Sequence, residues 1–98
     1  MELKAMEKHS AEAAELLKGM ANPNRLMVLC SLVDGELSVS ELNAVVPLSQ
    51  SALSQHLAYL RKANLVTTRK EAQTVFYSLN GDEAIRVIEV LKSIYCPD

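Results

Sequence analysis

The sequence predicts a mainly α-helical fold of about five helices with a single β-hairpin. Apolar residues recur at helical spacing through most of the chain, as in helices with one buried face. Residues 66–79 are instead rich in Thr, Val and aromatic residues, which strands favour. With 98 residues, of which 49% are hydrophobic and 22% charged, the chain fits one globular domain spanning residues 1–98.

The first helix is predicted from about Lys4 to Met20, where Ala, Glu, Lys and Leu predominate. Its apolar positions, which share one face, are Met6, Ala13, Leu17 and Met20. Phe76 and three tyrosines are the only aromatic residues, so the core is thin. We therefore expect a second copy of the chain to cover residues 1–20 and 82–96, the dimerisation helices of a homodimer.

A second helix is predicted after Asn22, because Asn caps the free amides of a helix start and Pro23 suits its first position. Its apolar stripe consists of Leu26, Leu29, Cys30 and Val33. Asp34 and Gly35 provide the stop. This spacing predicts that the Cys30 side chain faces the core.

A helix-turn-helix is predicted over residues 38–63. Ser38 and Glu41 have the spacing of a capping box, which starts a short third helix. Pro47 restricts the residue before it and ends that helix. Ser49 then caps a fourth helix, so the two helices are joined by a tight turn.

The fourth helix, from about Gln50 to Ala63, has two contrasting faces. Its apolar stripe consists of Leu53, Leu57 and Leu60. The opposite face carries Gln50, Ser51, Ser54, Gln55 and Ala58. Such short side chains let a helix lie close against another surface, although a polar face that only meets water is also common.

A β-hairpin, the wing, is predicted over residues 65–79, with strands at Val66–Lys70 and Gln73–Leu79. Its tip, residues 71–73, lacks the glycine that eases tight turns, so we expect a longer or mobile loop. A last helix follows over residues 82–96. Its apolar positions are Ile85, Ile88, Leu91 and Ile94 or Tyr95. We expect this helix to pair with the first one.

The charged residues are unevenly distributed, although the formal net charge is only −2. No Asp or Glu occurs between Glu41 and Glu71. The basic side chains of that window are Arg61, Lys62, Arg69 and Lys70, with His56 beside them. Residues 1–41, by contrast, carry seven acidic and four basic residues. One face of the protein can therefore be basic on an acidic body.

A helix-turn-helix followed by a basic hairpin is a winged helix-turn-helix, which suits double-stranded DNA. An α-helix fits the major groove, where Gln can bond adenine edges and Ser either base, while Lys and Arg bind phosphates. The predicted DNA-contacting residues are Ser49, Gln50, Ser51, Ser54, Gln55, His56, Arg61, Lys62, Arg69, Lys70 and Gln73. Because the reading helix has no cation before Arg61, we expect an A·T-leaning, pseudo-palindromic operator. The chain is thus predicted to be a transcriptional regulator.

Two other classes of function are weighed against this one. An enzyme is not expected, because the chain has no nucleophile elbow, no phosphate-binding glycine loop and no carboxylate spaced to partner His9 or His56. A winged helix that binds only proteins is the remaining alternative, and the acid-free basic window argues against it. The N-terminus is charged and no window approaches a membrane span, so we expect a cytoplasmic protein that does not bind membranes.

Several segments together resemble the ArsR/SmtB family of bacterial winged-helix repressors. They are residues 48–57, 60–61, 65–66 and 68–71, and the resemblance extends from about Leu16 to the C-terminus. It implies a dimer formed by the first and last helices, recognition by the fourth helix and a wing at the hairpin. Within the family, residues 69–77 and both cysteine positions resemble thiol-sensing virulence regulators, which implies activation of virulence or toxin genes by displacing a silencer.

The metal sites of that family are not expected here. Many members bind metal through a motif with two thiolates, but at residues 36–40 Ser38 and Ser40 stand in their place, and serine is a poor ligand for soft metals. A second family site uses His and acidic residues on the last helix, and residues 82–96 contain no His. We therefore expect neither a metal nor another cofactor.

Two cysteines, Cys30 and Cys96, stand far apart in the sequence. Their spacing alone favours a small core residue and a residue at a frayed helix end. The family resemblance implies instead a redox pair, whose oxidation to a disulfide or polysulfide bridge would weaken DNA binding. Lys92 favours a thiolate at Cys96 and the helix dipole opposes it, so the sequence leaves the reactivity open.

Overall fold

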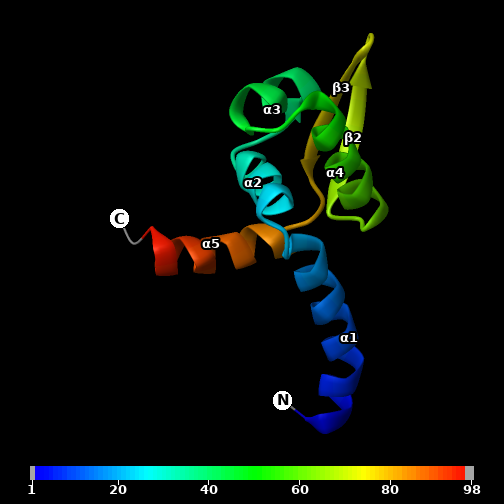
Figure 1. Cartoon of the computed structure of the whole chain (residues 1–98). Helices are drawn as coiled ribbons and strands as arrows, with labels where there is room; N and C mark the ends of the chain where they lie inside the picture. Colours follow the sequence, from blue (N-terminus) through cyan, green and yellow to red (C-terminus); the bar gives the residue numbers. More distant parts are fainter. Residues whose placement is uncertain (1, 97–98) are drawn as a thin grey trace.

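The computed structural model describes residues 2–96 and confirms a winged helix-turn-helix of five helices and one three-stranded antiparallel sheet (Figure 1). In chain order the elements are α1 (Leu3–Met20), α2 (Pro23–Ser31), β1 (Leu37–Ser38), α3 (Val39–Val45), α4 (Gln50–Lys62), β2 (Val66–Glu71), β3 (Thr74–Leu79) and α5 (Glu83–Tyr95). The strand order is β1-β3-β2. Figure 1 shows β2 and β3 projecting beside α3 and α4 at one end, while α1 extends from the opposite end and α5 leaves to the side.

Local capping bonds start the three central helices, as the sequence predicts. The Asn22 side chain accepts hydrogen bonds from two amides of the first turn of α2, at 2.9 and 3.1 Å. The Ser38 hydroxyl accepts from the Glu41 amide at 3.1 Å, and the Glu41 carboxylate accepts from the Ser38 amide at 2.9 Å. Ser49 caps α4 by accepting from an amide of its first turn at 3.1 Å. These bonds fix the start of both helices of the helix-turn-helix.

The helix α2 is shorter than predicted, and its cysteine faces outward. It ends at Ser31 and a turn follows, so the predicted stop at Asp34 and Gly35 lies beyond the helix. The buried side chains in and just after α2 are Val28, Leu29 and Leu32. Because these residues take the inner face, Cys30 lies on the outer side and is exposed. The prediction that Cys30 faces the core is therefore wrong.

The tip of the wing is a tight turn rather than the longer or mobile loop that we expected. The strands β2 and β3 pair along their whole length, and Glu71 lies opposite Thr74. Only Ala72 and Gln73 connect them, and Ala72 has a φ of 54°. Two-residue hairpin turns need positive φ to match the strand twist. Alanine adopts this conformation here although it lacks the freedom of glycine.

The two-residue strand β1 was not predicted from the sequence. Leu37 pairs with Tyr77 and Ser38 pairs with Phe76, so β1 lies along β3 on the side opposite β2. Two residues are too few to produce a recognisable alternation of apolar and polar side chains. The pairing joins the segment before α3 to the wing.

The core lies where α2 packs against α3, α4 and α5, with β2 also packed against α4. The predicted stripe of α4 is buried, with Leu53, Leu57 and Leu60 at most 1% exposed. The remaining buried apolar residues are Met20, Val28, Leu29, Leu32, Leu42, Val46, Leu65, Val66, Ala84 and Ile88. Because its inner face is anchored, α4 presents its outer face to solvent in a fixed orientation.

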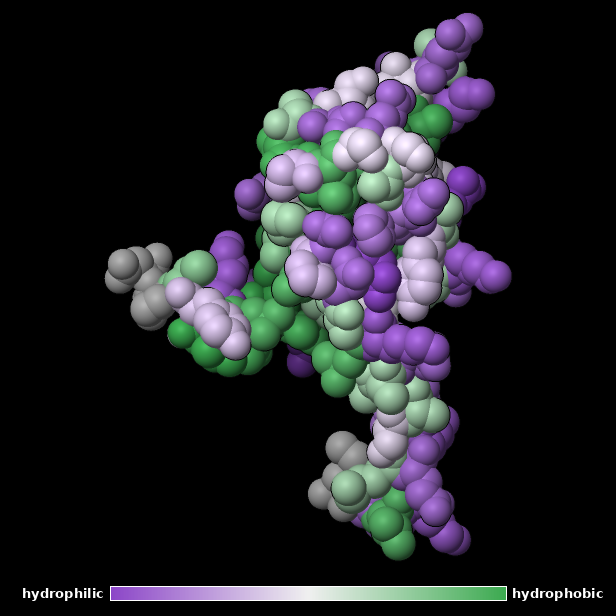
Figure 2. All heavy atoms as spheres, viewed as in Figure 1, coloured by the Kyte–Doolittle hydropathy of each residue, from purple (hydrophilic) through white to green (hydrophobic). Residues whose placement is uncertain are grey.

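Large parts of α1 and α5 extend beyond this core. Met20 and Ile88 are buried, whereas Leu17 is 54% and Ile94 is 60% exposed. The two helices diverge (Figure 1), so the expected pairing of the last helix with the first is not met inside a single chain. Figure 2 shows hydrophobic side chains gathered over α5 and its junction with α1. Within residues 2–96, no helix has both the length and the apolar character needed to cross a membrane.

Candidate nucleic-acid interface

The outer face of α4 is polar, made of short side chains and open to solvent. Its exposed residues include Gln50, Ser51, Ser54, Gln55, Ala58, Arg61 and Lys62. Positions 51, 54, 55, 58 and 62 recur at helical spacing and therefore share one side of the helix, opposite the buried leucines. Glutamine, serine and alanine leave room for another surface to approach closely, and the cations lie in the last turn.

Two predicted contact residues differ from the rest of this face. The Ser49 hydroxyl accepts a hydrogen bond from the Ala52 amide, so its first role is to cap α4. His56 is half-buried on the flank of the helix, beside the buried Leu57. Gln55, the residue before His56, is by contrast exposed on this face.

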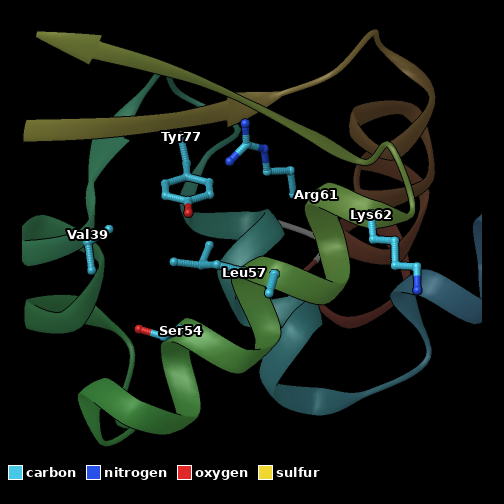
Figure 3. A pocket seen from close by; sticks show the side chains of 7 residues that line it. Val39, Ser54, Leu57, Arg61, Lys62 and Tyr77 are labelled. Carbon is cyan, nitrogen blue, oxygen red and sulfur yellow. The ribbon is translucent and has the colours of Figure 1, made fainter.

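A shallow groove lies between α4 and the sheet (Figure 3). It is lined by Val39, Ser54, Leu57, Ala58, Arg61, Lys62 and Tyr77. The Tyr77 side chain comes from β3 and points toward α4, whereas Lys62 points away from the groove. Val39 and Tyr77 were missed in the sequence, where Tyr77 belonged to the strand pattern and Val39 to the start of a helix. The groove brings helix and wing residues to one surface.

The wing contains a cation that is already paired. The Arg69 guanidinium donates two hydrogen bonds to the Glu36 carboxylate, at 2.6 and 3.2 Å, and one to Glu71 at 2.8 Å. It also lies over the Phe76 ring, 4.6 Å from the ring centre. The hydrogen bonds from Arg69 lower the pKa of Glu36, because they stabilise its charged form.

This pairing changes the charge pattern predicted for residues 42–70. Glu36 precedes that window and Glu71 follows it, yet both reach into it through the fold. Within residues 2–96, no carboxylate lies within salt-bridge distance of the three remaining cations, which are Arg61, Lys62 and Lys70. Lys70 and Gln73 are exposed on the wing. The basic surface therefore consists of three side chains rather than four.

An arginine outside this surface holds α4 in place relative to α1. Arg25 in α2 donates to the Gly19 and Lys18 carbonyls at 2.8 and 3.0 Å, which satisfies the last turn of α1. Its guanidinium lies over the Tyr59 ring of α4. One side chain thus links three helices, and no sequence pattern identified it in advance.

The two cysteines, Cys30 and Cys96, are free and exposed. Partial burial of the Cys30 thiol raises its pKa, and the positive charge of Lys92 opposes that shift. The Cys96 amide donates to the Lys92 carbonyl at 2.7 Å. The helices α2 and α5 contact each other, so the charge of Lys92 in α5 acts on Cys30 in α2.

Within residues 36–40, the segment compared above with a metal-binding motif, two side chains have other partners. Glu36 binds Arg69, and the Ser38 hydroxyl caps α3. In the part of the chain that the structure describes, no three His, Cys, Asp or Glu side chains are grouped as metal ligands would be.

A comparison with protein families and a comparison with individual proteins both match this chain to bacterial transcription regulators. Residues 22–68 match the family described as "Bacterial regulatory protein, arsR family". The chain is 60% identical to the transcriptional activator HlyU of Vibrio cholerae over 96 residues, which are 98% of this chain and 89% of that protein. It is 51% identical to the biofilm growth-associated repressor of Agrobacterium fabrum, over 96% of this chain and 80% of that protein.

Solved structures agree with the sequence comparison. Reduced HlyU from Vibrio cholerae matches with a TM-score of 0.88 at 61% identity, over 96% of this chain and 99% of that one. The transcriptional repressor BigR from Xylella fastidiosa matches with a TM-score of 0.91 at 41% identity, over 98% of both chains. These relatives are described as regulators of transcription, and none of them as an enzyme.

Proposed function

Because the chain belongs to the arsR family of bacterial regulatory proteins, and is thus a transcriptional regulator, we propose that it binds operator DNA in the cytoplasm as a homodimer. The observation that carries the proposal is the outer face of α4. That face is exposed, carries short polar side chains and ends in two cations, while its inner leucines anchor it to the core.

In this proposal α4 lies in the major groove. Gln50, Ser51, Ser54 and Gln55 contact base edges, since Gln suits adenine and Ser suits either base. A helix without Arg or Lys in its first three turns makes few guanine contacts. The operator is therefore A·T-leaning and pseudo-palindromic, one half-site for each subunit.

Phosphate contacts supply the affinity. Arg61 and Lys62 follow the reading residues along α4, and Lys70 and Gln73 lie on the wing, so all four can meet the backbone on either side of the groove. Six cation contacts in the dimer would give a slope of about −5 when the logarithm of affinity is plotted against that of salt concentration.

The exposed apolar parts of α1 and α5 support the homodimer. They include Leu3, Met6, Leu17, Val90, Ile94 and Tyr95. Two terminal helices with such residues on their surfaces are the elements that a second copy covers. The dimer sets the distance between the two α4 helices and hence the spacing of half-sites.

We further propose that Cys30 and Cys96 respond to oxidants or reactive sulfur species. Both thiols are exposed, the charge of Lys92 acts on Cys30, and the Cys96 amide bonds to the Lys92 carbonyl. Bridging them would tie α2 to the end of α5, which belongs to the proposed dimer surface, and so would change the spacing of the reading helices. We also propose, as the resemblance to virulence regulators implies, that DNA binding displaces a silencer at virulence or toxin genes. One relative is named a transcriptional activator, which supports activation as the outcome.

A gel-shift titration at two salt concentrations, with reduced and oxidised protein, tests these proposals. The reduced protein is expected to bind an operator found by genomic mapping, with affinity that falls as salt rises. Absence of any DNA binding would favour the alternative, a winged helix that binds only proteins. An oxidised protein that keeps two free thiols and full affinity would refute the thiol switch alone.

A further inference from the structure

We propose that Arg69 is a positioning residue that braces the wing against the helical body, and that Lys70 is the wing residue that contacts phosphate. The proposal rests on the DNA-binding function proposed above. It revises the role that the sequence suggested for Arg69, which was a phosphate contact like those of the other three cations.

The brace crosses the sheet from one edge to the other. Arg69 in β2 lies opposite Phe76 in the central strand β3, and Phe76 in turn lies opposite Ser38 in β1. The Arg69 side chain passes over the Phe76 ring and reaches Glu36, just before β1. Its two bonds to Glu36 span 33 positions of sequence and connect the outer strand of the wing to the segment that leads into α3.

The charges around Arg69 disfavour a phosphate contact at this residue. Glu36 and Glu71 each bond to the guanidinium, so the three side chains together carry a charge of −1. A phosphate would have to displace carboxylates that already use three donors of the guanidinium. A group of three side chains with a net negative charge does not attract a polyanion, and the guanidinium already has carboxylate partners.

Lys70 meets the opposite conditions. Successive side chains of a strand point to opposite faces, so Lys70 points away from the face that Arg69 shares with Glu71. It is exposed, and within residues 2–96 no carboxylate lies within salt-bridge distance of it. Two adjacent cations of one strand therefore have different roles.

The two roles of Arg69 predict opposite results for Glu36→Gln. If Glu36 braces the wing through Arg69, removing its charge weakens DNA affinity by about two- to fivefold, as expected for an exposed ion pair. If Glu36 merely masks a phosphate-binding arginine, the same change frees Arg69 and tightens binding. Asp34→Asn is the matched control, because it removes the same charge two residues earlier and Asp34 makes no side-chain bond to the wing.

The salt dependence separates the two cations. With a duplex that the protein selects from a random-sequence library, Lys70→Gln is expected to reduce the salt slope by about 1.8, or about 0.9 for each subunit. Arg69→Gln is expected to lower affinity while leaving the slope within about 0.5 of wild type. A loss of slope in Arg69→Gln equal to that in Lys70→Gln would overturn the proposal.

Phosphate ethylation interference distinguishes positioning from a general loss of structure. Glu36→Gln is expected to lose interference only at the phosphates that Lys70→Gln also loses, while those beside α4 remain. Uniform loss at all phosphates, or tighter binding by Glu36→Gln, contradicts the brace. If the wild-type protein binds no duplex, the proposed function itself fails; if it binds and Glu36→Gln binds more tightly, only the brace fails.

Discussion

The Arg25 guanidinium lies 4.1 Å from the centre of the Tyr59 ring, which joins α2 to the outer side of α4. The same guanidinium holds two carbonyls at the end of α1. A cation that stacks on an aromatic ring while it donates to a helix C-terminus fixes the angle between the elements it touches. Arg25 thereby connects the helix proposed for dimerisation to the helix proposed for reading DNA.

Replacing Arg25 by glutamine is expected to lower the free energy of unfolding by about 2 kcal/mol, because two charge-assisted hydrogen bonds and the stacking contact are lost. Urea denaturation measures this change. Lys8→Gln on the exposed side of α1 is the control and should leave stability within about 0.5 kcal/mol of wild type. Equal effects of the two substitutions would show that Arg25 does not link the helices.

The strained turn of the wing makes Ala72→Gly a stabilising substitution. Ala72 adopts a φ of 54°, which costs a residue with a Cβ atom about 1–2 kcal/mol, and glycine recovers part of that cost. We expect a gain of about 0.5–1 kcal/mol in the free energy of unfolding. Ala44→Gly, within α3, should instead lose about 1 kcal/mol. A loss of stability in both variants would contradict the assigned turn.

The main role of Ser49 should be to cap α4, independently of any contact with DNA. Ser49→Ala removes the acceptor for the Ala52 amide and is expected to cost about 1 kcal/mol of stability. Ser49→Asn retains a cap, and its free energy of unfolding should remain within a few tenths of a kcal/mol of wild type. Thermal unfolding of the two variants without DNA measures the difference, and equal melting temperatures would remove the capping role.

The pKa of Cys30 should govern how fast its thiol is alkylated. Burial raises this pKa and Lys92 opposes the shift, so Lys92→Gln is expected to raise it further and to slow reaction with iodoacetamide at neutral pH. Arg86→Gln, on the same helix, is the control. Because the pKa of Cys30 is raised in the folded state, the stability that its neutral thiol contributes is fully present below the pKa of the unfolded chain. That stability is lost as the pH rises through the folded-state pKa. A faster reaction in Lys92→Gln would contradict the placement of this charge.

The pKa of Glu36 is lowered by Arg69, so the ion pair stabilises the fold above the ordinary pKa of glutamate and loses this effect as the pH falls through the folded value. The difference in melting temperature between wild type and Glu36→Gln is therefore expected to shrink on acidification below that range. A difference that stays constant at all acidic pH values would mean that Glu36 acts without its charge.

Features encoded by neighbouring residues were predictable from the sequence. The caps at Asn22, Ser38 and Ser49 depend on side chains that bond to amides two or three residues away. The stripe of α4 depends on helical spacing alone. Together these features were sufficient to locate the helix-turn-helix and the wing.

Features that depend on contacts across the chain were not predictable in this way. The bonds between Arg69 and Glu36 connect residues 33 positions apart, so an acid-free window in the sequence did not remain acid-free in the fold. The orientation of Cys30 depended on which apolar neighbours filled the core, and α2 offered more apolar positions than its buried face could take. The strand β1 is defined by its pairing with β3, about 40 residues later in the chain.

The distance between the two α4 helices in the proposed dimer decides whether both can enter the major groove of one duplex. Spin labels at Ser51→Cys, in a background with Cys30→Ser and Cys96→Ser, allow pulsed electron paramagnetic resonance to measure it in solution. We expect the label distance to place the two α4 helices about 34 Å apart, one turn of the double helix. A monomer, or a dimer whose α4 helices lie at a distance that fits no whole number of DNA turns, would contradict it.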